Sequence, residues 1–349
     1  MSEDTSPAPD TNLINRERFP HESLSLFQRP DRLHDPLYVI TPVINANRSR
    51  QRWKAYQDFR VHIANSGAIL ITVEVAFGDR DFAVTTADDK NDVQLRSWHE
   101  LWLKERAINI GAMHMTRTYP DWKKFAWIDC DTFFVRPDFA NEIIHLLEHW
   151  PILQCWSQLT NTDSNWEIKS QLRSLMSIQF EHPGPPGNYY EDGGQKFGSP
   201  GLAWAARREA FEQMSGLLDI CCAGAGDWYL SAALLGNLDE AIKFRNDLSP
   251  AFVEAMMAYQ EHLRRGRWQE RSLVGNIGLM RGLCIHTWHG SRANRQYNTR
   301  GEILMRHQFD PRRDLKPTAN GLWALTDREP GLRKDLKAYF DQLGGDELS

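Results

Sequence analysis

The sequence predicts an α/β fold: an open, mainly parallel sheet with flanking helices and a helical C-terminal extension. Residues 37–40 form a short apolar run that ends at Thr41-Pro42, which is typical of a strand buried on both faces. Residues 48–65 carry aromatic and aliphatic side chains at helical spacing, and residues 68–75 are rich in β-branched residues. This strand-helix-strand order favours neighbouring parallel strands joined by a crossover helix.

The elements that follow continue this pattern. A second helix is predicted over residues 97–113 and a third buried strand over residues 124–128. The triplet Asp129-Cys130-Asp131 follows that strand directly. Because ligands of open α/β sheets bind at the carboxyl ends of the strands, a site is expected at this triplet.

The second half of the chain is predicted to add a strand, a loop and further helices. The strand lies within residues 151–157, and Gly and Pro crowd residues 181–201, the composition of an active-site loop. Helices are predicted over residues 207–215, 227–235 and 250–264. The last of them has Ser249 as its N-cap and Pro250 as its first residue.

The composition is that of a globular protein without a polycationic arm. The 349 residues include 41 Lys and Arg against 46 Asp and Glu, which gives a net charge of −5. No run approaches the roughly 18 apolar residues of a membrane span, and the polar N-terminus has no secretion signal. The five cysteines form no Cys-x-x-Cys pair, which favours buried, reduced thiols. Together these observations predict a cytoplasmic protein.

Three patterns of acidic and histidine residues differ in what they predict. Asp79-Arg80-Asp81 lies in a charged loop and is interpreted as a solvated turn. His145 and His149 match an inverted zinc-peptidase pattern, but the apolar stripe of their helix turns both toward water. Asp129 and Asp131 leave a buried strand, where two carboxylates repel unless a cation lies between them. The alternative for this pair is a turn capped by Asp.

Several motifs, taken in chain order, resemble those of the GT-A glycosyltransferases over about residues 37 to 300. In the donor half they are Thr41-Pro42, Glu74, residues 104–109 (Lys-Glu-Arg-Ala-Ile-Asn) and residues 128–131 (Ile-Asp-Cys-Asp). In the acceptor half they are residues 198–205, 224–228 (Gly-Ala-Gly-Asp-Trp) and 286–292 (His-Thr-Trp-His-Gly-Ser-Arg). The last two are similar to β-1,4-galactosyltransferases. Their multi-acid turn is here a single Asp227, which leaves the catalytic base and the stereochemical outcome open.

The resemblance implies a GT-A fold and metal-dependent transfer of a sugar from a UDP-sugar to an acceptor hydroxyl, with inversion. It implies a glycosyltransferase domain at 35–300 with donor half 35–135 and acceptor half 150–300. The residues themselves predict a flexible tail at 1–34, which lacks sustained periodicity, and a helical extension at 301–349, an appendage packed on the core. The metal, Mn²⁺ or Mg²⁺, is expected on Asp129, Asp131 and His289, with His286 as the substitute for His289.

The resemblance also implies roles for residues around the metal. Donor contacts are expected from Thr41, Pro42, Glu74, Lys104, Asn109 and Asp129, with Arg292 and Arg295 on the diphosphate. Asp227 is expected to act as general base, with Trp204 and Trp228 as a platform for the acceptor. Simpler interpretations stay open: an N-cap for Asp227, a core histidine for His289, core packing for the tryptophans and solvated surface for the arginines.

The alternatives for function are a nucleotidyltransferase or other nucleotide-sugar enzyme, and a non-catalytic protein that binds carbohydrate or nucleic acid. The acceptor is a glycan, a protein or a hydroxymethylated DNA base. The chain also resembles bacteriophage-type glycosyltransferases of DNA bases, which would place it in the host cytoplasm. The late arginines are the candidates for following a DNA backbone: Arg292, Arg295, Arg300, Arg306, Arg312 and Arg313.

Overall fold

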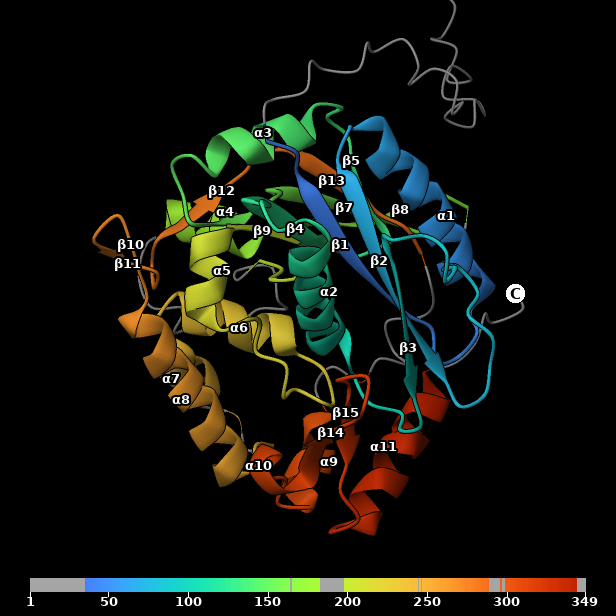
Figure 1. The fold of residues 1–349 in the computed structure, drawn as a ribbon. Coiled ribbons are helices and arrows are strands. Elements are labelled where there is room, and N and C mark those ends of the chain that lie inside the picture. The colour runs from blue at the N-terminus through green and yellow to red at the C-terminus, as the bar shows by residue number, and fades with distance from the viewer. Residues whose placement is uncertain are drawn as a thin grey trace, which may run out of the picture.

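A seven-stranded sheet forms the centre of the computed structural model, which describes residues 35–163, 165–182, 198–243, 245, 247–288, 296 and 299–343 (Figure 1). Its strand order is β12-β6-β9-β4-β1-β2-β3. The strands are β1 (Tyr38–Ile44), β2 (Ile69–Phe77), β3 (Asp92–Ser97), β4 (Lys124–Ile128), β6 (Ile152–Gln154), β9 (Ala203–Arg207) and β12 (Ile277–Leu279). Within this sheet β9 alone is antiparallel to its neighbours. The predicted open, mainly parallel α/β sheet is confirmed.

Helices cover both faces of this sheet. The side chains of β1 point alternately to the two faces, and both sets are buried under helices. Tyr38 and Ile40 belong to one hydrophobic core, and Val39 and Val43 to the other. The second core is completed by α1 (Arg50–Asn65) and α3 (Phe139–Leu146), and the first by α2 (Lys104–Thr118), α5 (Arg208–Met214) and α6 (Gly226–Leu234). The remaining helices of the domain are α4 (Leu175–Glu181), α7 (Leu238–Ile242) and α8 (Pro250–Arg265).

Local sequence signals place several helix ends. The Ser249 hydroxyl accepts a hydrogen bond from the Phe252 amide and Pro250 is the first residue of α8, as predicted. Ser49 caps α1 in the same way through the Arg52 amide. The second predicted helix was placed too early: residues 92–97 form β3, and α2 begins only at Lys104.

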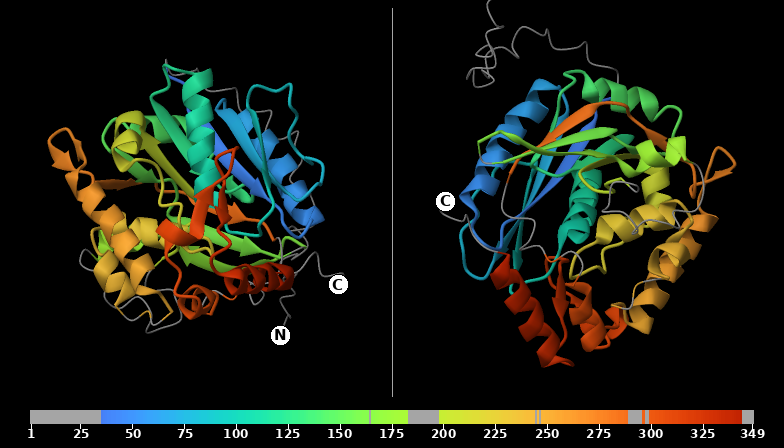
Figure 2. Two further views of the ribbon diagram at one scale, coloured as in Figure 1. Left: turned by 60° about the horizontal axis from the view of Figure 1, so that its bottom comes forward. Right: turned by 180° about the vertical axis from the view of Figure 1, so that it is seen from behind.

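A smaller, four-stranded sheet lies next to the carboxyl end of β4. Its order is β5-β13-β7-β8, with β5 (Thr132–Phe134), β7 (Gln158–Thr162), β8 (Ile168–Arg173) and β13 (Leu283–His286). The pair β7 and β8 crosses the molecule in the rear view of Figure 2. Because β13 pairs with both β5 and β7, His286 lies opposite Thr132 on one side and Asn161 on the other.

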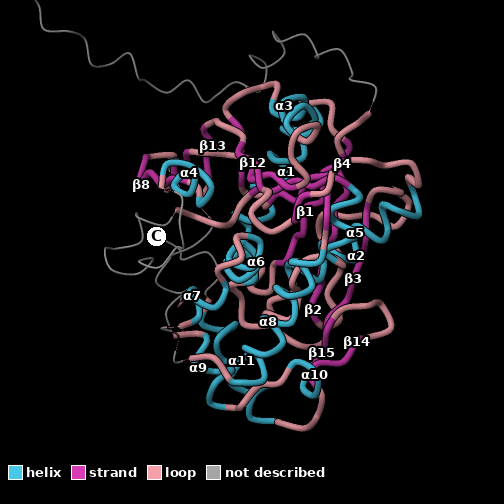
Figure 3. Tube along the Cα trace, turned by 90° about the vertical axis from the view of Figure 1, so that its left-hand side faces the viewer, coloured by secondary structure: helices cyan, strands magenta, loops and turns pink. Residues whose placement is uncertain are grey.

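The C-terminal extension is mostly helical, as predicted, and is packed on the domain. It contains α9 (Gly301–Arg306), α10 (Pro311–Asp314), the strand pair β14 (Leu315–Pro317) and β15 (Trp323–Leu325), and α11 (Pro330–Gln342). Figure 3 shows these elements together at one end of the molecule. Leu304, Phe309 and Leu336 belong to the same hydrophobic core as β1 and α2. A separate hairpin of β10 (Arg267–Trp268) and β11 (Arg271–Ser272) follows α8.

The structure also tests the expectations about membrane spans, cysteines and surface residues. No helix among the described residues combines the length and the apolarity that a membrane crossing requires. All five cysteines are buried free thiols, as predicted. Asp79, Asp81, His145 and His149 are all exposed, which agrees with their interpretation as surface residues.

Candidate active site

A cavity of about 430 Å³ lies at the carboxyl ends of β1 and β4. Five residues predicted for the site line it: Pro42, Lys104, Asp129, Asp131 and Asp227. The antiparallel direction of β9 contributes to this arrangement, since the segment before β9 runs beside the end of β4. The Asp129 amide donates to the Leu202 carbonyl at 2.8 Å. The predicted edge of the sheet therefore does hold a cavity lined by both halves of the chain.

Asp129 forms an ion pair with Lys104, the first residue of α2. The Lys104 Nζ lies 2.7 Å from Asp129 Oδ1, and both side chains are largely buried. Burial raises the pKa of Asp129; the Lys104 ammonium opposes this, and the neighbouring Asp131 adds to it. For Lys104, burial lowers the pKa but attraction to Asp129 and Asp227 outweighs it, so its pKa is raised. One lysine thus faces several carboxyl groups.

Asp131 lies next to His286, because β13 pairs with β5 directly after the acidic triplet. The Thr287 amide donates to the Asp131 carbonyl at 3.0 Å, and His286 Nε2 lies 3.6 Å from Asp131 Oδ1. His286 Nδ1 lies 2.9 Å from Asn161 Oδ1, and the Asn161 amide nitrogen donates to Ser170. This network fixes the imidazole ring so that Nδ1 faces Asn161 and Nε2 faces Asp131.

The pair of a carboxylate oxygen and an oriented imidazole nitrogen suits a divalent cation. Ligands bound at 2.0–2.2 Å at right angles lie about 3 Å apart, close to the separation of the Asp131 and His286 atoms. The predicted ligand His289 lies outside the described residues, whereas its substitute His286 is in place. Within the described part of the chain, no group of three or more His, Cys, Asp and Glu side chains forms a metal cluster.

Asp227 lies in the first turn of α6, and its carboxylate is close to Gly201. The N-cap of α6 is Ala225, so the simpler interpretation of Asp227 as N-cap does not hold. Its Oδ1 accepts from the Trp228 amide at 2.9 Å. A Cβ on Gly201 would lie 2.7 Å from Asp227 Oδ2, so only glycine leaves room for the carboxylate in this position.

Two charged residues of the cavity, Glu105 and Arg300, were not predicted as active-site residues. A Cβ on Gly226 would lie 2.5 Å from the Glu105 carboxyl carbon, and one on Gly224 would lie 2.7 Å from Arg300 Cζ. Burial raises the pKa of Glu105 to about 8, with Lys104 opposing and Asp227 adding to the effect. The sequence signal for both is the pair of glycines in the Gly-Ala-Gly-Asp turn.

Comparison with known proteins gives matches among solved structures only. No protein-family profile and no curated protein sequence matches the chain. A glycosyltransferase involved in glycosylation of the major capsid of PBCV-1 is 11% identical, with a TM-score of 0.29, and the match covers 74% of this chain and 98% of that one. Such a similarity is remote.

Two further solved structures match. A mutant β1,4-galactosyltransferase 7 from Drosophila, in complex with manganese, UDP-Gal and xylobiose, is 14% identical over 56% of this chain and 58% of that one, with a TM-score of 0.26. A protein assigned as a nucleotide-diphospho-sugar transferase from Desulfovibrio desulfuricans G20 is 12% identical over 78% and 94%, with a TM-score of 0.28. Because the TM-scores are this low, we interpret the residues of the site from their own geometry.

Three side chains that were predicted to contact the donor form hydrogen bonds within the fold. The Thr41 hydroxyl is fully buried and donates to the Ile128 carbonyl, linking β1 to β4. The buried Glu74 carboxylate accepts from the amides and one hydroxyl of residues 83–85. Asn109 bonds to Leu217 and Asp219, away from the residues that line the cavity. These bonds join elements of the fold, and the donor contacts of the three side chains stay predictions.

The two predicted acceptor tryptophans differ in exposure. Trp204 is only 3% exposed, stacks on Trp127 and donates its indole N–H to the Pro200 carbonyl. This burial agrees with core packing, and the platform role of Trp204 stays a prediction. Trp228 is partly buried against the hydrophobic core and does not line the cavity, and its acceptor role stays a prediction.

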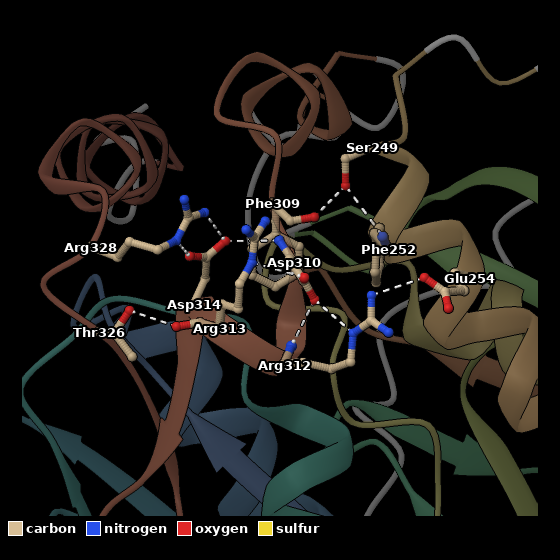
Figure 4. Close-up of polar contacts among 10 residues, drawn as sticks. All are labelled: Ser249, Phe252, Glu254, Phe309, Asp310, Arg312, Arg313, Asp314, Thr326 and Arg328. Carbon is tan, nitrogen blue, oxygen red and sulfur yellow. Dashed lines mark hydrogen bonds and ion pairs between the residues drawn. The ribbon is translucent and has the colours of Figure 1, made fainter.

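The late arginines do not form a shared basic face within the described residues. Arg306 pairs with Asp335, and Arg300 is buried. Figure 4 shows Arg312 and Arg313 on either side of Asp310, and Arg312 also pairs with Glu254. Arg292 and Arg295, the predicted diphosphate ligands, lie outside the described residues. The described arginines therefore favour neutralised surface and packing over a strip for DNA.

Proposed function

We propose that this chain is a metal-dependent glycosyltransferase that moves a sugar from a UDP-sugar to an acceptor hydroxyl. The observation that carries the proposal is the convergence of Asp129, Asp131, His286 and Asp227 on one cavity at the carboxyl edge of the sheet. In this proposal residues 35–135 form the donor half and residues 150–300 the acceptor half of one domain.

The donor set fits a divalent cation, and Asp131 and His286 would hold Mn²⁺ or Mg²⁺ with help from Asp129. When bound, such an ion neutralises the negative charge that develops on the departing diphosphate. The chain itself supplies the rest of the metal site. Asn161 orients the imidazole of His286, and Lys104 fixes the carboxylate of Asp129.

Asp227 is the residue we assign as general base. Its Oδ1 is fixed by the Trp228 amide, and its Oδ2 lies against Gly201. From this position it would accept the proton of the acceptor hydroxyl while that oxygen attacks the anomeric carbon. Attack from the face opposite the diphosphate gives inversion. The ion-paired late arginines make a glycan the acceptor that we favour over DNA.

A screen for UDP release tests this proposal. The purified chain is incubated with UDP-sugars and candidate acceptors, with and without Mn²⁺, and the products are analysed by mass. We expect metal-dependent UDP release that Asp131→Asn abolishes, while Asp227→Asn lowers kcat and spares donor binding. The matched control is Asp81→Asn, in the exposed Asp-Arg-Asp loop. Release of pyrophosphate would identify a nucleotidyltransferase, and donor binding without turnover in any acceptor mixture would identify a binding protein.

A further inference from the structure

We infer that the C-terminal extension completes the donor site and that Arg300, the residue directly before it, binds the diphosphate of the donor. This inference rests on the proposed function. Arg300 immediately precedes α9 and lines the same cavity as Asp129, Asp131 and Asp227. The extension was expected to be an appendage, but Phe340 of α11 also reaches the cavity wall.

Arg300 is held in place by neighbouring aromatic side chains. It is 7% exposed, and its guanidinium lies over the ring of Trp102, with Cζ 5.7 Å from the ring centroid. Its Nη1 lies 3.5 Å from the hydroxyl of Tyr339 on α11. A guanidinium positioned by an aromatic ring and a hydroxyl loses little freedom when it binds an anion.

The Gly-rich turn before α6 is shaped around this guanidinium. A Cβ on Gly224 would lie 2.7–3.0 Å from three guanidinium atoms of Arg300, and Gly224 has a φ of +95°, which side chains rarely adopt. The same turn carries Asp227 three residues later. Arg300 and the proposed base are therefore positioned by one short segment.

The charges around the cavity also favour this role. A diphosphate brings further negative charge into a cavity already lined by several acidic groups. Arginine presents a planar fork that matches two phosphate oxygens at once, which an ammonium group does not. Arg300 is thus the buried cation best suited to the anionic part of the donor.

Calorimetric binding of UDP, UMP and uridine to the full chain in Mn²⁺ tests the inference. Arg300→Gln should weaken UDP binding by about 10-fold or more, as expected for a lost charge-assisted contact, and leave uridine binding unchanged. The matched control is Arg306→Gln, an exposed arginine of the same extension, which should bind all three probes as the wild type does. Arg300→Lys should keep the fold and lose several-fold in UDP affinity, and serves as the test if the Gln variant does not fold.

The outcomes of this experiment distinguish a failure of the role of Arg300 from a failure of the proposed function. Wild-type affinity for UDP in the folded Arg300→Gln variant, or in the Lys variant where the Gln variant does not fold, would overturn the role of Arg300 and leave the proposed function standing. A loss of uridine and UDP affinity in equal measure would also overturn it, because the arginine would then act on the shape of the cavity. Wild-type protein that binds none of the three probes would overturn the proposed function and the inference together.

Discussion

Replacing Gly201 by alanine tests whether the position of the Asp227 carboxylate matters for turnover. The new Cβ would lie 2.7 Å from Asp227 Oδ2, whereas an ordinary contact is 3.4–4 Å. The carboxylate must therefore retreat by about 0.7 Å, since the Gly201 backbone does not adopt the left-handed conformation that would itself exclude alanine. Because a misplacement of about 1 Å can reduce turnover about 100-fold, we expect kcat to fall about 10- to 100-fold.

The assay is steady-state UDP release at saturating acceptor, with the donor varied. The donor KM should stay within about twofold of the wild-type value, because the proposal assigns donor binding to Lys104 and Asp129 and not to Asp227. Asp227→Asn sets the lower limit of kcat. Gly282→Ala is the matched control, because the nearest atom to its new Cβ is the flexible Arg136 Cδ at 3.7 Å. A folded Gly201→Ala enzyme with wild-type kcat would refute the assignment of Asp227 as base.

Three other predictions concern the metal site, the ion pair and the core. Asn161→Leu should weaken Mn²⁺ activation about 10-fold or more, because the His286 ring loses its orienting partner; a metal titration of UDP release with unchanged half-activation would contradict this. Lys104→Met should lower the free energy of unfolding by about 2 kcal/mol, measured by urea denaturation, because Asp129 keeps a largely buried charge without its cation. Burial lowers the pKa of His62 to about 4, so the unfolded chain takes up the proton first and stability falls as the pH drops from 6.5 to 4, by up to about 3 kcal/mol. His62→Gln should remove most of that loss in urea denaturation at pH 7 and pH 4.5, and an equal loss in both proteins would exclude His62 as its source.

The sequence predicts the central strands well and the peripheral ones poorly, for a physical reason. β1 and β4 are buried on both faces, and each contains a short apolar run, residues 38–40 and 125–128. β1 continues beyond its predicted end at Thr41-Pro42 as far as Ile44. β3 is an edge strand with the polar sequence Asp-Val-Gln-Leu-Arg-Ser, and β8 is largely exposed. Neither one has the apolar pattern on which strand prediction depends, so the smaller sheet could not be predicted.

The residues of the candidate site also differ in how well the sequence predicts them. Asp129 and Asp131 were predictable, because two acids directly after a buried strand have few structural uses. Thr41 and Glu74 lie within β1 and β2 and not at their ends, and their side chains satisfy buried donors and acceptors of the backbone. A sequence alone does not distinguish this use from a contact with a ligand. The glycine at position 224 marks a close approach of some side chain, but the sequence does not say that this side chain is Arg300, because the contact joins segments more than 70 residues apart.

The contact between Gly224 and Arg300 has a consequence for how this protein can change over time. A larger residue in the turn would expel the guanidinium, and its backbone would be strained at a φ of +95° whether or not the arginine is present. Loss of the arginine therefore does not open this position to larger residues. Across descendants of this sequence the glycine should persist even where the arginine has been replaced, and every lineage that keeps the arginine should keep the glycine with it.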